Sequence, residues 1–312
     1  MAEGHQQNRA YRHRAAGTAG TAAAAAAAVL AAVGLLAGCS AGQGGSGGSG
    51  AGATGTGPGG TGGSAGGDSA LVSSDHLAAD PLTAVRNAAD NTGHSGSVQD
   101  ATTLRTVSAD KHVTLKGTGG YDYTSRTGQL VVDLPAGGKL TEVVTPGTVY
   151  MLNRSNAVPA GKWVKLDVRE LSDGNLVSSG ATNPVDAASA LRGATSATKV
   201  GTERIGGVAA THYTGTLDLA RAAQATGGPS GYGLSSGARA FTDKQVPYQV
   251  WLDPHGRILR VVEVFTFART AGSSKPADQV RVTSQSDFSG FGEAVRPSVP
   301  SASEIYTGPA KK

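Results

Sequence analysis

The residue with the most distinctive chemistry is Cys39, the only cysteine in the 312-residue sequence. It ends the tetrapeptide Leu36-Ala37-Gly38-Cys39, directly after an alanine-rich apolar run with arginines before it. Small residues ahead of a cysteine at this place form a lipobox, in which a signal peptidase cleaves and the thiol receives a diacylglyceryl group. The pattern predicts a lipoprotein signal peptide over residues 1–38 and Cys39 as the first, lipidated residue of the mature chain.

Two other fates of this segment are compatible with its composition. Cleavage by ordinary signal peptidase nearby would discard Cys39 or leave it as a free thiol, and an uncleaved run would be a membrane helix. The apolar length, the flanking charge and the position of the cysteine together favour lipidation. We therefore expect the protein at the extracytoplasmic face of the plasma membrane, anchored through acylated Cys39.

Composition divides the rest of the chain in two. Residues 39–70 begin with Cys39 and continue as an almost pure Gly, Ser, Ala and Thr segment, which buries too little apolar surface to fold and is expected to be a disordered tether. Residues 71–312 have the length and composition of one folded domain. The sequence therefore predicts three parts, which are a signal peptide, a tether and a domain.

Charge excludes one class of partner. The full sequence has a formal net charge of +4, but without residues 1–38 it has 24 basic and 22 acidic residues and a net charge of +2. A nearly neutral domain without a basic stripe lacks the electrostatic footprint of a nucleic-acid-binding protein. We expect no nucleic-acid partner.

Catalytic and metal-binding signatures are also missing from the sequence. No HExxH, CxxC, Walker A or EF-hand pattern occurs between Leu71 and Lys312, and the histidines there are scattered. Glu263 lies inside an apolar strand pattern, and we interpret it as a solvated glutamate of the outer face. The expectation is a protein that is not an enzyme and has no cofactor or metal.

Two helices have clear start signals. Asp80-Pro81 is an N-cap followed by a proline at the first helical position, and apolar residues continue at helical spacing to about Asn91. Asn183-Pro184 opens a second helix that Gly193 can end. Residues 220–240 start like a helix but contain several glycines, so we expect a loop with a helical start, in which a surface insertion is favoured over a flap beside a cavity.

Elsewhere the hydrophobic period is two, which is typical of strands. The segments are short, rich in Val, Thr, Leu and Tyr, and separated by turn residues. They predict an α+β fold with about ten or eleven antiparallel strands, over 97–107, 111–123, 129–134, 139–145, 148–153, 162–167, 196–204, 208–219, 245–252, 257–267 and 279–288.

Several of these strands are apolar on both faces, which a sheet with one solvated face would not show. Ordinary packing under the two helices is one explanation, and a concave face kept open for a hydrophobic ligand is the other. If alternation is followed along the late strands, one face carries the candidates for a ligand-binding wall, which are Val250, Leu252, Val262 and Val264.

The order of these features resembles a known family. The lipobox and tether are followed by a set of short phrases in a fixed order, which are Asp80-Pro81-Leu82, Gly161-Lys162-Trp163, Val200-Gly201-Thr202-Glu203, His212-Tyr213, Val250-Trp251-Leu252-Asp253 and Gly256-Arg257. Over residues 75–307 this order resembles the actinobacterial LppX/LprG lipoproteins, relatives of the LolA-type lipid carriers. The resemblance implies a half-barrel of antiparallel strands wrapped around helices, with a hydrophobic cavity for the acyl chains of a lipid or lipoglycan.

Two functions follow from the residues and the resemblance together. The first is a non-enzymatic lipoprotein that binds or carries a membrane lipid or lipoglycan. The second is a cell-envelope scaffold or sensor with the same fold, no usable cavity and a protein partner. A large cavity would favour the first function, and a filled interior the second.

Overall fold

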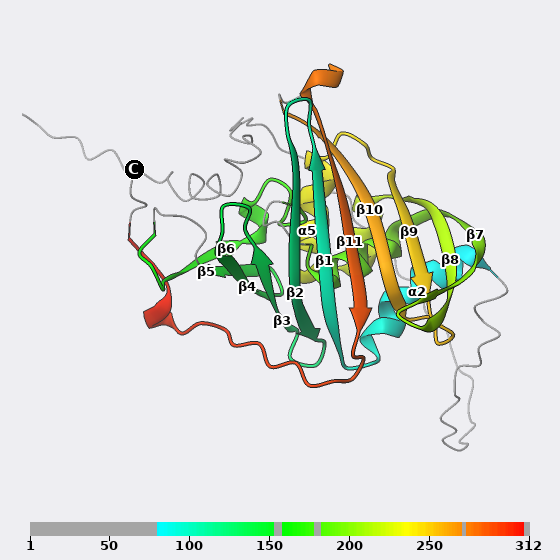
Figure 1. The fold of residues 1–312 in the computed structure, drawn as a ribbon, viewed down its shortest axis with the longest axis horizontal. Helices are drawn as coiled ribbons and strands as arrows, with labels where there is room; N and C mark the ends of the chain where they lie inside the picture. Colours follow the sequence, from blue (N-terminus) through cyan, green and yellow to red (C-terminus); the bar gives the residue numbers. More distant parts are fainter. Residues whose placement is uncertain (1–79, 153–157, 178–181, 270–272, 309–312) are drawn as a thin grey trace, which may run out of the picture.

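The fold is built on one antiparallel sheet of 11 strands, described here from a computed structural model (Figure 1). The structure describes residues 80–152, 158–177, 182–269 and 273–308. The expected signal peptide and tether, Cys39 included, lie outside the described residues. No helix within the described part of the chain is long and apolar enough to cross a membrane.

The sheet consists of two sequential meanders that meet at its centre. The strand order is β6-β5-β4-β3-β2-β1-β11-β10-β9-β8-β7, so the first and last strands of the chain are neighbours. The first meander contains β1 (Ser97–Val107), β2 (His112–Asp122), β3 (Thr127–Asp133), β4 (Lys139–Thr145), β5 (Thr148–Leu152) and β6 (Trp163–Asp167). The second contains β7 (Ala194–Ile205), β8 (Val208–Leu217), β9 (Val246–Leu252), β10 (Ile258–Ala268) and β11 (Gln279–Ser289). The predicted antiparallel sheet of ten or eleven strands is confirmed.

Four helices of the described residues lie on one side of the sheet, which is open (Figure 1). They are α2 (Pro81–Gly93), α3 (Pro184–Ala190), α4 (Leu219–Thr226) and α5 (Tyr232–Ala240). Short 3-10 turns are η3 (Val168–Glu170), η4 (Leu191–Gly193), η5 (Pro229–Gly231), η6 (Pro276–Asp278) and η7 (Ala302–Glu304). We call the helix-covered side of the sheet the inner face and the opposite side the outer face.

Side-chain caps fix the starts of the two helices whose signals are clearest in the sequence. The Asp80 carboxylate accepts hydrogen bonds from the backbone N–H groups of Leu82 and Thr83, each at 3.2 Å. The Asn183 side chain accepts from the Val185 N–H at 3.0 Å. Both caps satisfy N–H groups that a helix start leaves without partners, which confirms the two predicted helices.

The segment between β8 and β9 differs from its expectation, because most of it is helical. Its glycines allow close packing and do not act as helix breakers. A Cβ on Gly237 would lie 2.5 Å from the Leu176 Cδ1, and one on Gly233 would lie 2.8 Å from the Gly174 carbonyl oxygen. Tertiary contact therefore outweighs the low helix propensity of glycine here.

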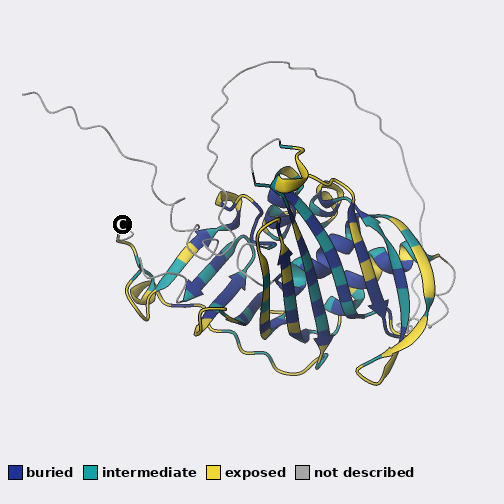
Figure 2. Cartoon of the chain, turned by 45° about the horizontal axis from the view of Figure 1, so that its top comes forward, coloured by how far each residue is buried: buried dark blue, intermediate teal, exposed yellow. Residues whose placement is uncertain are grey.

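The main hydrophobic core lies between the inner face and the helices. Buried residues alternate with partly exposed ones along the central strands, as Figure 2 shows. The helices contribute mostly small residues to this core, such as Ala84, Val85 and Ala88 of α2 and Ala187 and Ala188 of α3. Small side chains let the helix backbones approach the sheet closely, so most of the inner face is filled with protein.

A β-bulge between Ile258 and Arg260 changes which face each residue of β10 occupies. Ile258 belongs to the main core, but after the bulge it is Val261 and Phe265 that point to the inner face. A bulge inserts one residue opposite its partner strand and so reverses the alternation that follows. Glu263 alternates with Val261 and Phe265 and so points to the inner face, where it is 1% exposed. Its interpretation as a solvated outer-face glutamate is therefore wrong.

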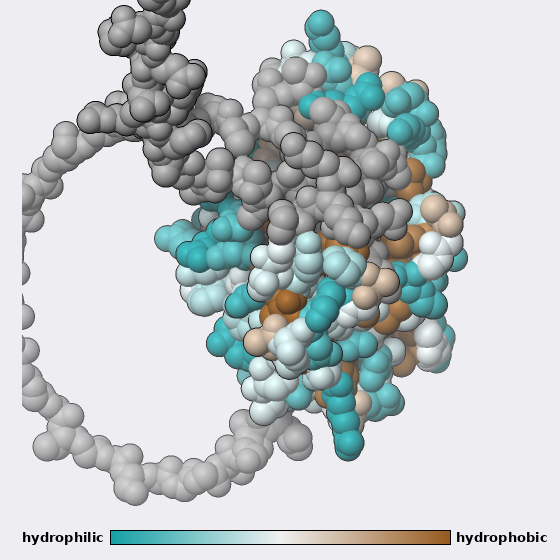
Figure 3. Space-filling view, turned by 90° about the vertical axis from the view of Figure 1, so that its left-hand side faces the viewer, coloured by the Kyte–Doolittle hydropathy of each residue, from teal (hydrophilic) through white to brown (hydrophobic). Residues whose placement is uncertain are grey.

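After β11 the chain runs past the first meander to its edge strand, where Trp163 and Ile305 form a parallel bridge (Figure 1). The Tyr306 N–H donates to the Trp163 carbonyl at 2.8 Å. This strap covers part of the β6 edge. Figure 3 views the molecule from this side and shows hydrophobic residues as separate spots among hydrophilic and neutral ones.

Candidate functional site

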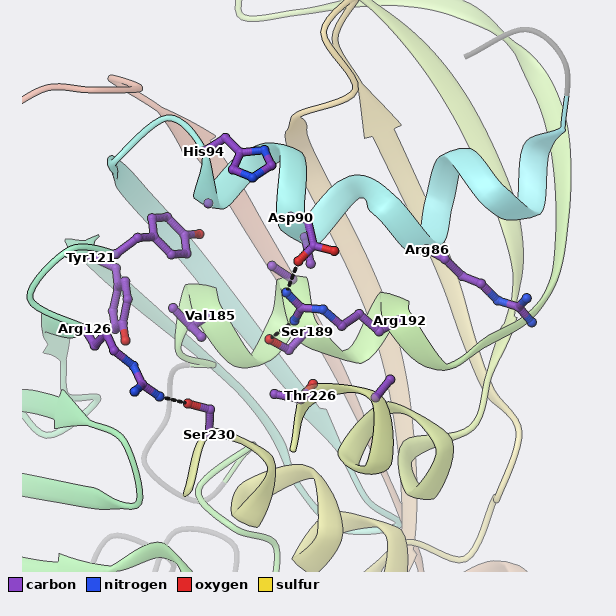
Figure 4. Close-up of a pocket in the computed structure, with 15 residues that line it drawn as sticks. Arg86, Asp90, His94, Tyr121, Arg126, Val185, Ser189, Arg192, Thr226 and Ser230 are labelled. Carbon is purple, nitrogen blue, oxygen red and sulfur yellow. Dashed lines mark hydrogen bonds and ion pairs between the residues drawn. The ribbon is translucent and has the colours of Figure 1, made fainter. Parts of the chain in front are cut away.

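An open cleft of about 680 Å³ lies between α2, α3, the β2–β3 turn and the α4–η5 segment. This volume is within the range of small-molecule binding sites, which is about 300–1,000 Å³. Figure 4 shows α2 on one side of the cleft, α3 behind it and the α4–η5 segment opposite. The cleft is therefore formed by elements from both meanders and from the connection between them.

One part of the cleft lining is apolar. Ala89 of α2, Val185 and Ala188 of α3 and Ala225 of α4 contribute aliphatic carbon. Tyr121 adds an aromatic ring, which packs edge to face against Tyr123 with ring centroids 5.1 Å apart. These surfaces can bury the hydrocarbon part of a ligand without burying an unpaired polar group.

The other part of the lining is cationic. Arg192 donates to the Asp90 carboxylate at 2.6 Å and to the Ser189 hydroxyl at 2.8 Å. Arg126 donates to the Ser230 hydroxyl at 2.8 Å (Figure 4). Arg86 donates through two nitrogens to the Ala194 carbonyl, at 2.7 and 2.9 Å. Three guanidinium groups thus share the cleft with a single carboxylate, that of Asp90.

The β2–β3 turn holds Arg126 in an unusual backbone conformation. Its φ is 56°, in the left-handed region that glycine adopts far more easily. The Asp122 carboxylate accepts from the N–H groups of Thr124 and Ser125, at 2.8 and 3.2 Å, and so fixes the preceding residues. A non-glycine residue in this conformation costs about 1–2 kcal/mol. The turn therefore holds an arginine at the cleft where glycine would fit with less strain.

Two hydroxyl groups in the lining have no partner. The Tyr123 hydroxyl and the Thr226 Oγ1 are both buried, and neither makes a hydrogen bond within the described part of the protein. Burial raises the pKa of Tyr123, and it raises the pKa of the neighbouring Tyr121 to about 12, so both phenols stay protonated and can donate. Buried hydroxyls without partners are uncommon in folded proteins.

A small side pocket of about 30 Å³ adjoins the cleft and shares Tyr121, Val185 and Ser230 with it. It is also lined by Asp186 of α3. Burial raises the pKa of Asp186 to about 7, against the opposing effect of its hydrogen bond from Asn183 at 3.3 Å. This carboxyl group is thus largely protonated below neutral pH and adds little negative charge to the side pocket.

Among the residues that the structure describes, no group of three or more His, Cys, Asp or Glu side chains is arranged to hold a metal ion. His94, the one histidine in the cleft lining, is exposed at the end of α2.

The four residues predicted to form a ligand-binding wall lie on two faces of the sheet. Val250 and Leu252 are fully buried in the main core on the inner face. Val262 and Val264 are half-buried on the outer face, where Val262 packs near the small cluster of Ala210, Trp251 and Leu259. None of the four lines the cleft. The bulge in β10 is the reason that the two pairs are separated, and a role for either pair in ligand binding stays a prediction.

The sequence gives little warning of the cleft. Arg126 and Arg192 lie in a turn and a 3-10 segment, where a charged side chain usually indicates only solvent exposure. They come together because α3 crosses beneath α2 near the β2–β3 turn, as Figure 4 shows. A signal for Arg126 could have been found in the turn chemistry, since Asp122 begins an Asx turn.

Comparisons with known proteins found similar solved structures but no match in sequence. No family model matches the chain, and no curated protein matches it. The lipoprotein LppX of Mycobacterium tuberculosis is similar in structure, with 19% identity, a TM-score of 0.42, and coverage of 70% of this chain and 97% of LppX. LprF of Mycobacterium bovis is similar at 14% identity and a TM-score of 0.41, with coverage of 71% and 97%.

A LolA superfamily protein of Nitrosomonas europaea is similar at 10% identity and a TM-score of 0.30, with coverage of 72% of this chain and 96% of that protein. At these identities the similarity concerns the fold alone.

Proposed function

We propose that the protein is a non-enzymatic lipoprotein, anchored at the extracytoplasmic face of the plasma membrane through Cys39, that binds or carries a lipid or lipoglycan. The observation that carries this proposal is the open cleft, in which apolar and cationic surfaces lie next to each other. An amphiphile has the same division, with a hydrocarbon part and a polar headgroup. The lipobox and the tether would place the cleft close to a membrane that supplies such ligands.

The size of the cleft limits what part of the ligand it can enclose. Each methylene removed from water contributes about 0.8 kcal/mol, so a few methylenes beside Val185 and Ala188 suffice for binding that can be measured. Because most of the inner face is filled by helices, the cleft would hold part of an acyl chain together with the headgroup. Opening of the helix layer is not required for this partial enclosure.

Native mass spectrometry of the full-length protein, purified from bacterial membranes, tests the proposal. We expect a non-covalent lipid adduct in addition to the mass of the acylated Cys39. Replacing Ala225→Trp should fill part of the cleft and lower the lipid occupancy several-fold, because Ala225 is an exposed lining residue that can change without disturbing the core. Ala101→Trp is the matched control, since Ala101 is an exposed alanine of β1 outside the cleft.

Two results would contradict the proposal. Absence of any lipid adduct under conditions that preserve the fold would mean that the protein binds no lipid. Equal occupancy in Ala225→Trp and Ala101→Trp would place the lipid somewhere other than this cleft.

A second candidate is a scaffold or sensor that docks a cell-envelope protein. The filled inner face favours it, because Val250, Phe265 and Leu217 are all fully buried beneath helices. In that case the protein purified from membranes would carry a stoichiometric protein partner and no lipid. The same native mass spectrum therefore separates the two candidates.

A further inference from the structure

The charges in the cleft are unevenly distributed. Arg86, Arg126 and Arg192 line it together with one carboxylate, and that carboxylate already accepts from Arg192. In the part of the chain that the structure describes, no carboxylate lies within ion-pair distance of Arg86 or Arg126. The lining therefore has a net charge of +2 when His94 is neutral. A cluster of this kind attracts an anion.

Arg126 and Arg192 are the two arginines best placed to share one ligand. Arg126 comes from the β2–β3 turn and Arg192 from η4, and Figure 4 shows both beside Val185, whereas Arg86 extends away from them. Neither guanidinium group uses all of its five N–H donors in the contacts described above. Both can therefore donate to a further oxygen without losing their present partners.

The uncharged polar groups nearby are donors as well. The hydroxyls of Ser189 and Ser230, two residues of the cleft lining, each accept from an arginine and keep a proton to donate. A site with many donors and few acceptors suits an oxyanion, which accepts several hydrogen bonds and donates none. It disfavours a cationic headgroup, which would face three guanidinium groups.

We propose that the ligand of this cleft is an amphiphile with an anionic headgroup, whose oxyanion lies between Arg126 and Arg192 while its hydrocarbon lies against Val185 and Ala188. A lipid phosphate has the chemistry that fits. This inference rests on the proposed function, because it names the headgroup class for the same cleft. It adds a specificity that the apolar lining alone would not give.

Lipid loading from vesicles of defined composition tests the headgroup. The full-length protein is incubated with phosphatidylglycerol or with diacylglycerol of the same acyl chains, and bound lipid is quantified by native mass spectrometry. Both lipids offer the same hydrocarbon, but only phosphatidylglycerol carries an oxyanion. We expect about tenfold higher occupancy with phosphatidylglycerol, as is typical for a charge-assisted hydrogen bond, and a smaller preference at high salt.

Charge variants then assign the preference to named residues. Arg126→Gln and Arg192→Gln should each lower phosphatidylglycerol occupancy about tenfold and leave diacylglycerol occupancy unchanged. Arg126→Lys keeps the charge and should retain most of the preference. Arg221→Gln is the matched control, because Arg221 is an exposed arginine of α4 that does not line the cleft.

The outcomes distinguish failure of this inference from failure of the proposed function. Two results together would overturn the anionic headgroup and leave lipid binding intact. They are equal loading of the two lipids into the wild type, and equal phosphatidylglycerol occupancy in Arg126→Gln and Arg221→Gln. No loading of either lipid would overturn the lipid-binding function itself. Full displacement of phosphatidylglycerol by millimolar inorganic phosphate would mean that the site holds free phosphate, which would also overturn the proposal.

Discussion

The backbone N–H of Ile258 donates to the Thr92 hydroxyl at 3.0 Å, in the buried interior between β10 and α2. The Thr92 hydroxyl in turn donates to the Ala88 carbonyl at 2.7 Å. Ile258 lies next to the β-bulge that interrupts the pairing of β9 with β10. The Thr92 side chain of α2 therefore provides an acceptor for a backbone N–H beside the bulge. This bond ties the end of α2, and with it one side of the cleft, to the sheet.

Thr92→Val should destabilise the protein by about 1–3 kcal/mol, because it leaves the buried Ile258 N–H without an acceptor at nearly constant side-chain volume. Thr92→Ser keeps the hydroxyl and should lose clearly less. Chemical denaturation of both variants measures the difference. Equal losses in the two variants would show that packing of the methyl group, and not the hydrogen bond, matters at this position.

The raised pKa of Asp186 predicts a dependence of stability on pH. Its pKa rises from 3.8 to about 7 on folding, so the folded state favours the protonated carboxyl. The stability contribution is complete below about pH 4, declines as pH rises toward 7, and changes little above that. Asp186→Asn should therefore be more stable than the wild type at pH 8, with the gap closing toward pH 4.

Thermal melts of both proteins across pH 4–8 measure this gap. Because the comparison is a difference, the buried acid Asp100, whose pKa is also raised, cancels. The Asp186 charge adds to burial in raising the pKa of Glu263, so Glu263 widens the gap at high pH in the same direction. A constant difference over the whole range would mean that the Asp186 carboxyl titrates normally in the folded state.

Gly237→Ala tests the close packing of α5. Alanine favours an isolated helix by about 1 kcal/mol over glycine, but here its Cβ would lie 2.5 Å from Leu176 and 3.1 Å from Phe241. We expect a net loss of about 1–3 kcal/mol from overpacking. Gly201→Ala is the control, since a Cβ on Gly201 would meet nothing within 4 Å, and its melting temperature should change little.

Arg126→Gly should have opposite effects on stability and binding. Glycine adopts the φ of 56° without strain, so the loss of the bond to Ser230 is offset by about 1 kcal/mol of relieved backbone strain. The melting temperature should stay level or rise, while anionic lipid occupancy falls about tenfold. A fall in both quantities would show that Arg126 stabilises the fold and has no special role in binding.

Cys39→Ala tests the anchor expected from the lipobox. Without the thiol, no diacylglyceryl group can be attached, and the protein should leave the membrane fraction or accumulate as its precursor. Two acyl chains give stable anchoring without help from charge, so high salt should not release the wild type. Membrane fractionation with immunodetection measures both effects, and mature Cys39→Ala protein that stays tightly bound would require another anchor.

Local signals predicted much of the architecture. The caps at Asp80 and Asn183 placed two helices, and period-two patterns placed every strand of the sheet, because these depend on neighbours in the sequence. Features that depend on distant contacts were not predictable in the same way. The glycines of residues 220–240 look like helix breakers until Leu176 and Gly174 are placed beside them.

The wall residues show the limit most clearly. Simple alternation from Leu252 and its partner Ile258 places Val262 and Val264 on the same face, and a single bulged residue reverses this. The strand is apolar on both sides, so its pattern does not reveal the reversal. Glu263 misled the interpretation further, because a charged residue in a strand usually faces solvent. The cleft arginines were missed since their proximity depends on the crossing of α2 and α3.

The pairing of β1 with β11 at the centre of the sheet also determines the order in which the fold can form. Each meander consists of hairpins between neighbouring strands, which close short loops, whereas β1 and β11 are separated by nearly the whole domain. We therefore expect the two half-sheets to form first and to join last. Until they join, β1 and β11 each present an unpaired edge, which makes the middle of the finished sheet the part most open to wrong pairing during folding.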